Sequence, residues 1–302
     1  MLHGIARDSW CGYFGGRSVV PANQTKTPFW RTNYAGRQIM FSAYHLNEKN
    51  APYYLKCLRE SKVSWLHGYP SVLSLLASYV VDFSLEPVRS VRMVTTGAES
   101  LSGSQRSQIE RAFGARITEH YGQAETVANI SECENGSLHV DEDFSLVEFE
   151  EMNKAPGRYR IIGTNWVNHA FPLFRYDTGD LATMGSGVSC SCGQNGRIVS
   201  QIDGRMEDYL VLPNGAKIGR LDHIFKDCVN IREAQIHQAR DGCITFHIVR
   251  GKEYKEADER LLENEVRKRL GADVSFNIKY PDEIAKTASG KLRLVVSDLV
   301  NN

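Results

Sequence analysis

The stretch His120-Tyr-Gly-Gln-Ala-Glu125 follows residues 115–119, whose composition favours a short β-strand. We expect that strand to end where the aromatic residue and the glycine begin, and ligands bind at the carboxyl ends of strands in open α/β sheets. Tyr121 offers a ring for a purine to stack on, and Gly122 lets the backbone approach a phosphate. Glu125 offers a carboxylate to Mg²⁺. An ordinary strand-to-helix turn with a solvated glutamate is the alternative interpretation.

The bulk properties describe a globular protein with room for roughly two domains. The 302 residues carry 36 basic and 36 acidic side chains, which gives no electrostatic reason to expect nucleic-acid binding. No signal peptide is recognisable, and no apolar run is long enough to insert into a membrane. The seven cysteines form no dense framework, so we expect a reducing cytoplasm with free thiols or a metal site.

The first half of the chain alternates between expected strands and helices. Residues 1–50 have weak periodicity and are interpreted as loop and edge structure, as if the chain began within a domain. Beyond them the order of strand, helix and strand predicts a parallel sheet with right-handed crossovers. Three polar turns, 67–71, 97–100 and 120–125, are expected to converge on one edge of this sheet. The expected elements are helix 47–60, strand 63–66, helix 72–81, strand 91–96, a helix ending at Phe113 and strand 115–119.

From about residue 137 the pattern changes to that of antiparallel β structure. Short alternating segments occur at 137–140, 145–149, 157–162 and 197–202. The last part predicts a small α+β unit with strands near 209–212, 234–239 and 243–249 and an amphipathic helix at 256–270. The fold class is therefore α/β: a large domain with a mixed sheet and a small antiparallel region, residues 1–203, and a smaller α+β domain, residues 204–302.

Two cysteines one residue apart, Cys190 and Cys192, form a short chelating pair. A structural zinc site needs four ligands, and Cys133 and His139, which flank a glycine turn, are the best further candidates. The site would then be a structural Zn²⁺ centre that cross-links the β region. In the alternative interpretation the four residues are unconnected and the cysteines are free thiols. The other cysteines, Cys11, Cys57, Cys228 and Cys243, show no ligand spacing and are expected to be buried.

Five motifs occur in a fixed order and together resemble the adenylate-forming acyl-CoA ligase superfamily. Within it, the chain is most similar to the phenylacetate–CoA ligase-like branch that includes CapK-type capsule biosynthesis proteins. The resemblance runs from Trp10 to the C-terminus. The motifs are Gly97-Ala-Glu99, His120-Tyr-Gly-Gln-Ala-Glu125, Arg175-Tyr-Asp-Thr-Gly-Asp180, Gly204-Arg-Met-Glu-Asp208 and Lys286-Thr-Ala-Ser-Gly-Lys291.

The resemblance implies a role for each of these positions. The adenine would lie against the first motif and stack on Tyr121, and Asp180 would accept hydrogen bonds from the ribose hydroxyls. Lys291 would stabilise the charge that develops between carboxylate and α-phosphate, and Asp208 would be the hinge of the small domain. Glu125 would hold Mg²⁺. The implied nucleotide-binding residues are Gly97, Ala98, Glu99, His120, Tyr121, Gly122, Gln123, Asp180 and Arg205.

The implied reaction is activation of a carboxylate by ATP to an acyl-adenylate, followed by transfer to a thiol, usually coenzyme A. The family's Ser/Thr/Gly-rich phosphate-binding loop has no counterpart here, since the early glycine-rich segment Gly12-Tyr-Phe-Gly-Gly16 contains no Ser or Thr hydroxyl. We therefore expect a member that lacks the first part of its large domain and is impaired when alone. Two alternatives remain. The first is a nucleotide-binding or scaffold protein without turnover. The second is one half of a split ligase, which would pair with a complementing chain or form a homodimer.

Overall fold

The computed structural model describes residues 3–299 except 7, 18, 22, 62, 153–155, 186–189, 206–208, 214–216, 219–220, 226, 272–273 and 288–290. The chain divides into two compact units, each built from separate stretches of sequence. We call residues 7–94, 101–117 and 207–302 the α/β unit, and residues 1–6, 95–100 and 118–206 the β unit. The domain boundary expected at 203/204 stays a prediction.

The α/β unit begins with three strands that the sequence did not predict and that form one end of a larger sheet. Strands β1 (Cys11–Phe14), β2 (Trp30–Asn33) and β3 (Gln38–Phe41) replace the loop structure expected over residues 1–50. Strand β1 lies between β3 and β4 (Trp65–Gly68) and is parallel to both. A Cβ atom on Gly12 would lie 2.8 Å from Leu66 Cδ2, so this glycine belongs to a packed strand and not to a phosphate loop. The expectation of loop structure was therefore wrong for this segment.

Three helices accompany this sheet, and their ends follow from the sequence. Helix α1 (Ala51–Glu60) has Pro at its first turn, and α2 (Pro70–Asp82) is buried throughout Pro70–Val80. Helix α3 (Gly103–Phe113) starts with a capping box in which Ser102 and Gln105 satisfy each other's backbone N–H groups. It ends at Gly114, whose φ of 59° is the left-handed conformation that glycine tolerates.

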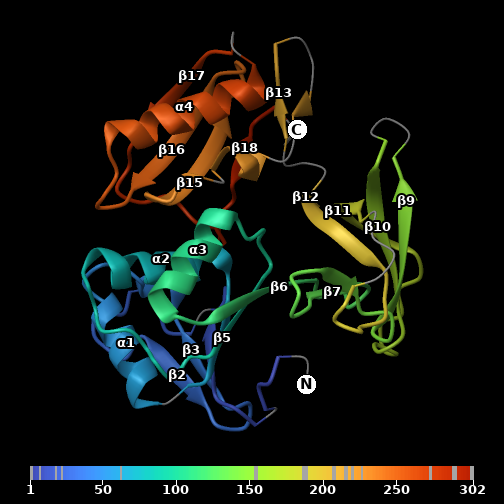
Figure 1. Ribbon diagram of the computed structural model, residues 1–302, viewed down its shortest axis with the longest axis horizontal. Coiled ribbons are helices and arrows are strands. Elements are labelled where there is room, and N and C mark those ends of the chain that lie inside the picture. Colours follow the sequence, from blue (N-terminus) through green and yellow to red (C-terminus); the bar gives the residue numbers. More distant parts are fainter. Residues whose placement is uncertain are drawn as a thin grey trace. The chain divides into compact units, whose positions relative to one another are not determined.

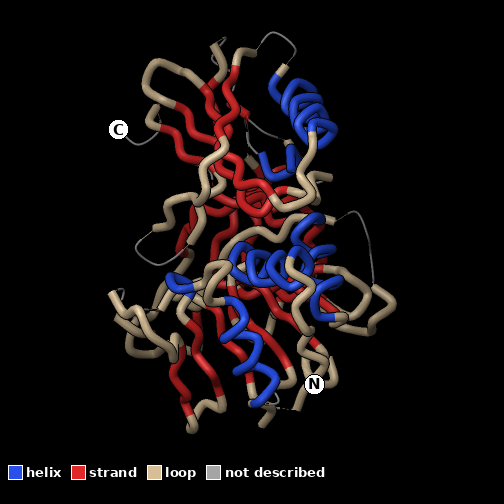
Figure 2. The backbone as a smooth tube through the Cα atoms, turned by 90° about the vertical axis from the view of Figure 1, so that its left-hand side faces the viewer, coloured by secondary structure: helices blue, strands red, loops and turns tan. Residues whose placement is uncertain are grey.

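The C-terminal part of the α/β unit is a four-stranded sheet with the order β17-β16-β15-β18. Helix α4 (Glu256–Leu270) packs on it through Leu262, Val266 and Leu270, which share a core with Phe246 (Figure 1). Figure 2 colours the same trace by secondary structure and shows this helix beside the strands. The remaining elements are η1 (Ala43–His45), β13 (Leu210–Val211), β14 (Lys217–Ile218), η2 (Leu221–Phe225), β15 (Ile231–Gln238), β16 (Ile244–Arg250), β17 (Phe276–Lys279) and β18 (Val295–Ser297).

The β unit is antiparallel, as predicted from the alternation beyond residue 137. Its strands follow the order β6-β7-β8-β12-β11-β10-β9. Strands β5 (Met93–Gly97) and β6 (Arg116–Gly122) begin in the α/β unit and end in the β unit. The other strands are β7 (Asn129–Glu132), β8 (Leu138–Val140), β9 (Ser145–Glu151), β10 (Arg158–Asn165), β11 (Tyr176–Met184) and β12 (Ile198–Arg205). In the part of the chain that is described, no helix is long and apolar enough to cross a bilayer.

Candidate nucleotide site and metal centre

Strand β6 is longer than predicted and includes the first residues of the candidate nucleotide site. The strand was expected to end before Tyr121, but it runs through Gly122 because β7 pairs with it. His120, Tyr121 and Gly122 lie opposite Ser131, Ile130 and Asn129. Tyr121 is thus held in a strand and not in a flexible turn.

Two of the three predicted polar turns meet at this strand. A Cβ atom placed on Gly97 would lie 2.9 Å from the backbone oxygen of His120, so only glycine permits this approach. Ala98 follows with a φ of 65°, a strained conformation for a residue other than glycine. Ala98 is exposed and Glu99 is half-buried at this end of the strand. The third turn, 67–71, belongs to the other unit, and its convergence with these two stays a prediction.

Tyr121 and Asp180 are joined by a hydrogen bond across the β unit. The phenolic hydroxyl donates to Asp180 Oδ2 over 2.8 Å, and Gln123 Nε2 lies 3.5 Å from the same hydroxyl. The backbone N–H of Asp180 donates to Thr178 Oγ1 over 3.1 Å. The ring expected to stack on a purine and the carboxylate expected to bind its ribose are therefore neighbours.

The bend in strand β11 that presents Asp180 is fixed by Asp177, which precedes it. Gly179, with a φ of 73°, donates its N–H to Asp177 Oδ1 over 3.0 Å. Burial raises the pKa of Asp177, but hydrogen bonds from Arg160 and from Gly179 outweigh it, so the net pKa is lowered. Asp177 thus remains ionised and keeps the turn in place.

His120 is oriented by a polar network that the sequence did not reveal. Its Nε2 lies 2.5 Å from Asn129 Oδ1, and the amide nitrogen of Asn129 contacts Asp141. Ser131 Oγ donates to the same carboxylate over 2.7 Å. Since Asn129 donates to Asp141, its oxygen is the acceptor for His120 Nε2–H. No spacing signal links these residues, because strand pairing brings them together.

The other predicted nucleotide residues are only partly placed. The backbone oxygen of Glu125 accepts a hydrogen bond from Asn165 Nδ2 over 3.1 Å, which fixes where its half-buried side chain begins. The backbone of Arg205 lies opposite Asp180 in the β11–β12 pair, whereas its side chain is outside the description. Asp208, the expected hinge, also lies outside the described residues.

Lys291 lies in the α/β unit, at the end of its motif. Its backbone N–H donates to Thr287 Oγ1 over 3.0 Å, and its carbonyl accepts from the N–H of Thr287 over 2.9 Å. The ammonium nitrogen lies 5.7 Å from the centroid of the Tyr69 ring, within the range of a cation–π contact. Its approach to the nucleotide residues, which belong to the other unit, stays a prediction.

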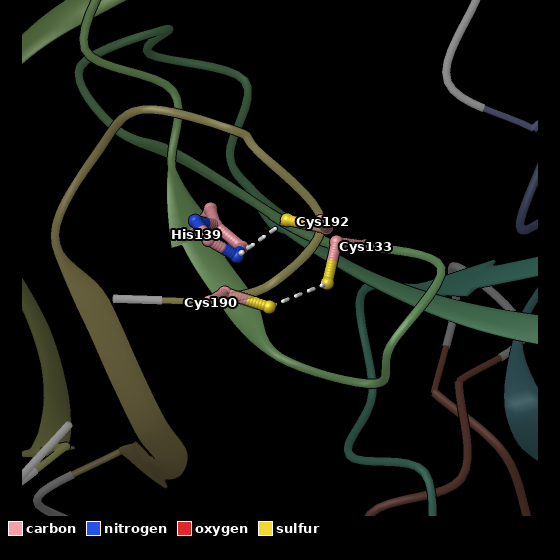
Figure 3. A group of neighbouring side chains, drawn as sticks. All are labelled: Cys133, His139, Cys190 and Cys192. Atoms are coloured by element: carbon pink, nitrogen blue, oxygen red, sulfur yellow. Dashed lines mark hydrogen bonds between the residues drawn. The ribbon is translucent and has the colours of Figure 1, made fainter. Parts of the chain in front are cut away.

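The four predicted zinc ligands are brought together in the β unit (Figure 3). The ligand atoms of Cys133, His139, Cys190 and Cys192 all lie within 4.8 Å of one another. Cys133 Sγ is 3.7 Å from Cys190 Sγ, and Cys192 Sγ is 3.5 Å from His139 Nε2. Zn–S bonds of about 2.3 Å and Zn–N bonds of about 2.1 Å at tetrahedral angles require S···S and S···N edges of roughly 3.8 and 3.6 Å. A disulfide needs about 2.05 Å, so these two distances match the edges of a tetrahedral zinc site and not a disulfide.

Hydrogen bonds reach three of these sulfur atoms, and the pKa is lowered for one of them, Cys190, and raised for Cys192. Asn135 N–H donates to Cys133 Sγ over 3.3 Å, and Gln194 N–H donates to Cys192 Sγ over 3.4 Å. The side chain of Ser137, followed by the backbone of Cys192, lowers the pKa of Cys190 to about 5. Thiolates are the ligands that zinc binds.

The remaining cysteines are where the sequence placed them, with one exception. Cys11, Cys57 and Cys228 are buried, and burial raises the pKa of Cys11 and of Cys228 to about 12. Cys243 is exposed, which contradicts the expectation that it is buried. It follows a tight turn at Gly242, whose φ is 85°, and this turn lies at the surface.

Comparison with known proteins matches two regions of the chain to family models. Residues 27–148 match the AMP-binding enzyme family, and residues 210–298 match the CapK C-terminal domain. Protein CapK of Staphylococcus aureus is 26% identical over 304 residues, covering 98% of this chain and 67% of CapK. Phenylacetate-coenzyme A ligase of Thermus thermophilus is 28% identical over 160 residues, covering 47% of this chain and 36% of the ligase.

A solved structure agrees with this fold. The 2-hydroxyisobutyryl-CoA ligase in complex with 2-HIB-AMP superposes with a TM-score of 0.72 at 19% identity, covering 98% of this chain and 66% of the ligase. That ligase was captured in its postadenylation state. At this level of identity the likeness establishes the fold.

Proposed function

Because the chain belongs to the adenylate-forming acyl-CoA ligase superfamily, in its CapK branch, we propose that it activates a carboxylate with ATP. In this reaction a carboxylate oxygen attacks the α-phosphorus, the bond to the β-phosphate oxygen breaks, and pyrophosphate leaves with that electron pair. The acyl-adenylate would then pass its acyl group to the thiol of coenzyme A, releasing AMP. The acyl-adenylate in the 2-hydroxyisobutyryl-CoA ligase supports the first step by analogy of fold.

The observation that carries this proposal is the hydrogen bond between Tyr121 and Asp180. It places a flat ring beside an acceptor-only carboxylate, the pair that an adenosine needs for its base and its ribose. Gly97 and Ala98 would cover the base from β5, with Glu99, His120, Gly122, Gln123 and Arg205 around it. Glu125 would hold Mg²⁺ on the phosphates, and Lys291 would offset the charge of the transition state.

The cysteine–histidine cluster is proposed to hold a structural Zn²⁺. Its dimensions and donor set fit tetrahedral zinc. All four positions would be filled by protein, which leaves none for a substrate or water. The ion would tie β7, β8 and the segment before β12 together and would take no part in the reaction.

Nucleotide binding without turnover is the second candidate. The chain spans 67% of the length of CapK and 36% of the phenylacetate–CoA ligase. Catalysis by the whole protein is therefore a proposal for this chain. One half of a split ligase, completed by another chain or by a second copy, is the related proposal. We expect the protein in the cytoplasm.

Calorimetric titration of the purified chain with AMP and with Mg-ATP tests the proposed function. Binding of both, with ATP tighter, supports activation of a carboxylate and justifies a screen of carboxylic acids by pyrophosphate exchange. Binding of AMP with no gain for ATP favours nucleotide binding without turnover. If neither nucleotide binds, the proposed function is wrong.

A further inference from the structure

Helix α2 is held at its C-terminal end by two cations from the C-terminal sheet of the same unit. Arg232 on β15 donates from Nε to Asp82 Oδ2 over 3.0 Å and also contacts this oxygen through Nη2. The Arg232 and Asp82 side chains are only 15% and 11% exposed. Lys252, which follows β16, donates to the backbone oxygen of Asp82 over 3.2 Å. Cations are favourable at this end of a helix.

Aromatic rings complete this contact. The Arg232 guanidinium carbon lies 5.3 Å from the centroid of the Tyr79 ring and 5.9 Å from that of Phe83. Lys252 Nζ lies 5.3 Å from the Phe83 ring centroid. We call the five residues Asp82, Tyr79, Phe83, Arg232 and Lys252 the α2 clamp. A largely buried arginine that donates twice to one carboxylate oxygen and lies beside two aromatic rings is more tightly held than a surface ion pair.

The opposite end of the same helix meets Lys291. Tyr69 is the N-cap residue of α2, and its ring is the one that Lys291 Nζ approaches at 5.7 Å. The helix has 13 residues and is buried along Pro70–Val80, so it is a rigid element roughly 20 Å long. The Arg232 contact and the Lys291 contact are therefore made with the two ends of one rigid helix.

A second ion pair connects the clamp to the segment that carries Lys291. Glu233 follows Arg232 directly in β15, and its carboxylate lies 3.0 Å from Lys286 Nζ. These side chains are 4% and 17% exposed, respectively. Lys286 opens the motif that ends at Lys291, and Thr287 is hydrogen-bonded to Lys291. The path from Asp82 to Lys291 thus consists of direct contacts.

We propose that the α2 clamp is a positioning site for Lys291. The Asp82–Arg232 contact fixes where the C-terminal sheet lies along α2, and this fixes Lys291 at the Tyr69 ring. The inference deepens the proposed function, since it concerns the lysine assigned to adenylation. Arg232 and Asp82 act through Lys291 and touch no substrate.

Acetylation of individual lysines, followed by mass spectrometry, tests the clamp without any need for turnover. In Arg232→Gln and in Asp82→Asn we expect Lys291 to be acetylated roughly tenfold faster than in the unmodified chain, because the contact that holds it is lost. Lys268, which is 70% exposed on α4, is the internal reference and should keep its rate. Arg260→Gln is the matched control, since its ion pair with Glu256 is 65% and 81% exposed.

Two further variants separate positioning from damage to the fold. The reversed pair Asp82→Arg with Arg232→Asp should restore much of the protection of Lys291 if the contact itself matters. Tyr69→Leu should expose Lys291, whereas Tyr69→Phe, which keeps the ring face, should not. An unchanged Lys291 rate in folded Arg232→Gln and Asp82→Asn overturns the clamp.

Titration of the same variants with AMP distinguishes this inference from the proposed function. The nucleotide residues belong to the β unit, so Arg232→Gln should keep the AMP affinity of the unmodified chain. If the unmodified chain binds no AMP, the proposed function fails while the acetylation rates still report on the clamp. If AMP binds and Lys291 keeps its rate in the clamp variants, the proposed function stands and the clamp does not.

Discussion

The cysteine–histidine cluster and the proposed nucleotide site lie in the same unit but are held together in different ways. The four ligand atoms of the cluster converge on one another within 4.8 Å. The nucleotide residues come from β5, β6 and β11 and are joined by backbone contacts and by the bond from Tyr121 to Asp180. The four side chains of the cluster face one common point, where a metal ion would bind. The residues of the proposed nucleotide site are held by contacts within the protein.

This difference indicates which ligand should contribute to folding. Thiolates that face each other at 3.7 Å repel unless a cation or protons neutralise them. The Asp180 carboxylate, in contrast, accepts a hydrogen bond from the Tyr121 hydroxyl, and the backbone N–H of Asp180 donates to Thr178 Oγ1. We therefore expect metal to contribute to the stability of the β unit, and nucleotide to bind a site that is already formed.

The largest expected effect is that of removing the metal. Zinc binding and folding are coupled where the ligands come from separate segments. Chelation, or Cys190→Ser, should remove about 5 kcal/mol of stability and lower the Tm by roughly 10 °C. Scanning calorimetry with and without chelator, together with metal analysis of the purified protein, measures both quantities.

Cys243→Ser is the control for this prediction, because Cys243 is exposed, is not one of the four clustered residues and belongs to the α/β unit. It should keep both the metal and the Tm. A protein that is purified without metal and has the same Tm in chelator would show that the four residues are free thiols.

The next effect concerns the ribose carboxylate. Asp180→Asn replaces two charged acceptor oxygens with an amide, and hydrogen bonds to a charged group contribute roughly 1.5–3 kcal/mol. AMP should then bind about 10- to 150-fold more weakly by calorimetry, with the Tm nearly unchanged. The exposed Asp143→Asn is the matched control.

The ligand can be varied alongside the protein. In the unmodified chain, 2′-deoxy-AMP and 3′-deoxy-AMP should bind more weakly than AMP, and in Asp180→Asn this difference should shrink. Equal losses in both proteins would place the ribose away from Asp180.

Helices with clear end signals were predictable from the sequence. Helix α4 occupies residues 256–270 as expected, since acidic residues fill its first turn and basic residues its last. The cysteine–histidine cluster was also predictable, because ligand type and short spacing restrict the possible partners. In both cases the information is local in the sequence.

Strands without a local sequence pattern were not predictable, because partners far along the chain determine them. Strand β1 has four residues, too few for a periodic pattern, and it is formed by parallel pairing with β3 and β4. Strand β11 was interpreted only as a motif, yet Asp177 and Asp180 lie in a nine-residue strand bent at Gly179. The network behind His120 depends on the same kind of pairing. The pairing of strands that are distant in the sequence is thus what could not be predicted from the sequence.

The smallest expected effect isolates one hydroxyl of the nucleotide site. Tyr121→Phe removes the donor to Asp180 but keeps the ring, so AMP affinity should fall only about 2- to 10-fold. Tyr121→Leu also removes stacking, which contributes roughly 1–3 kcal/mol per base, and should therefore cost much more. Calorimetric titration of the two variants separates orientation from stacking. Equal losses in both would mean that the ring does not contact the base. Neither substitution alters the cysteine–histidine cluster, so the Tm of both variants should stay close to that of the unmodified chain. A fall in Tm as large as that of Cys190→Ser would contradict the view that the metal supports the fold whereas the nucleotide binds a site that is already formed.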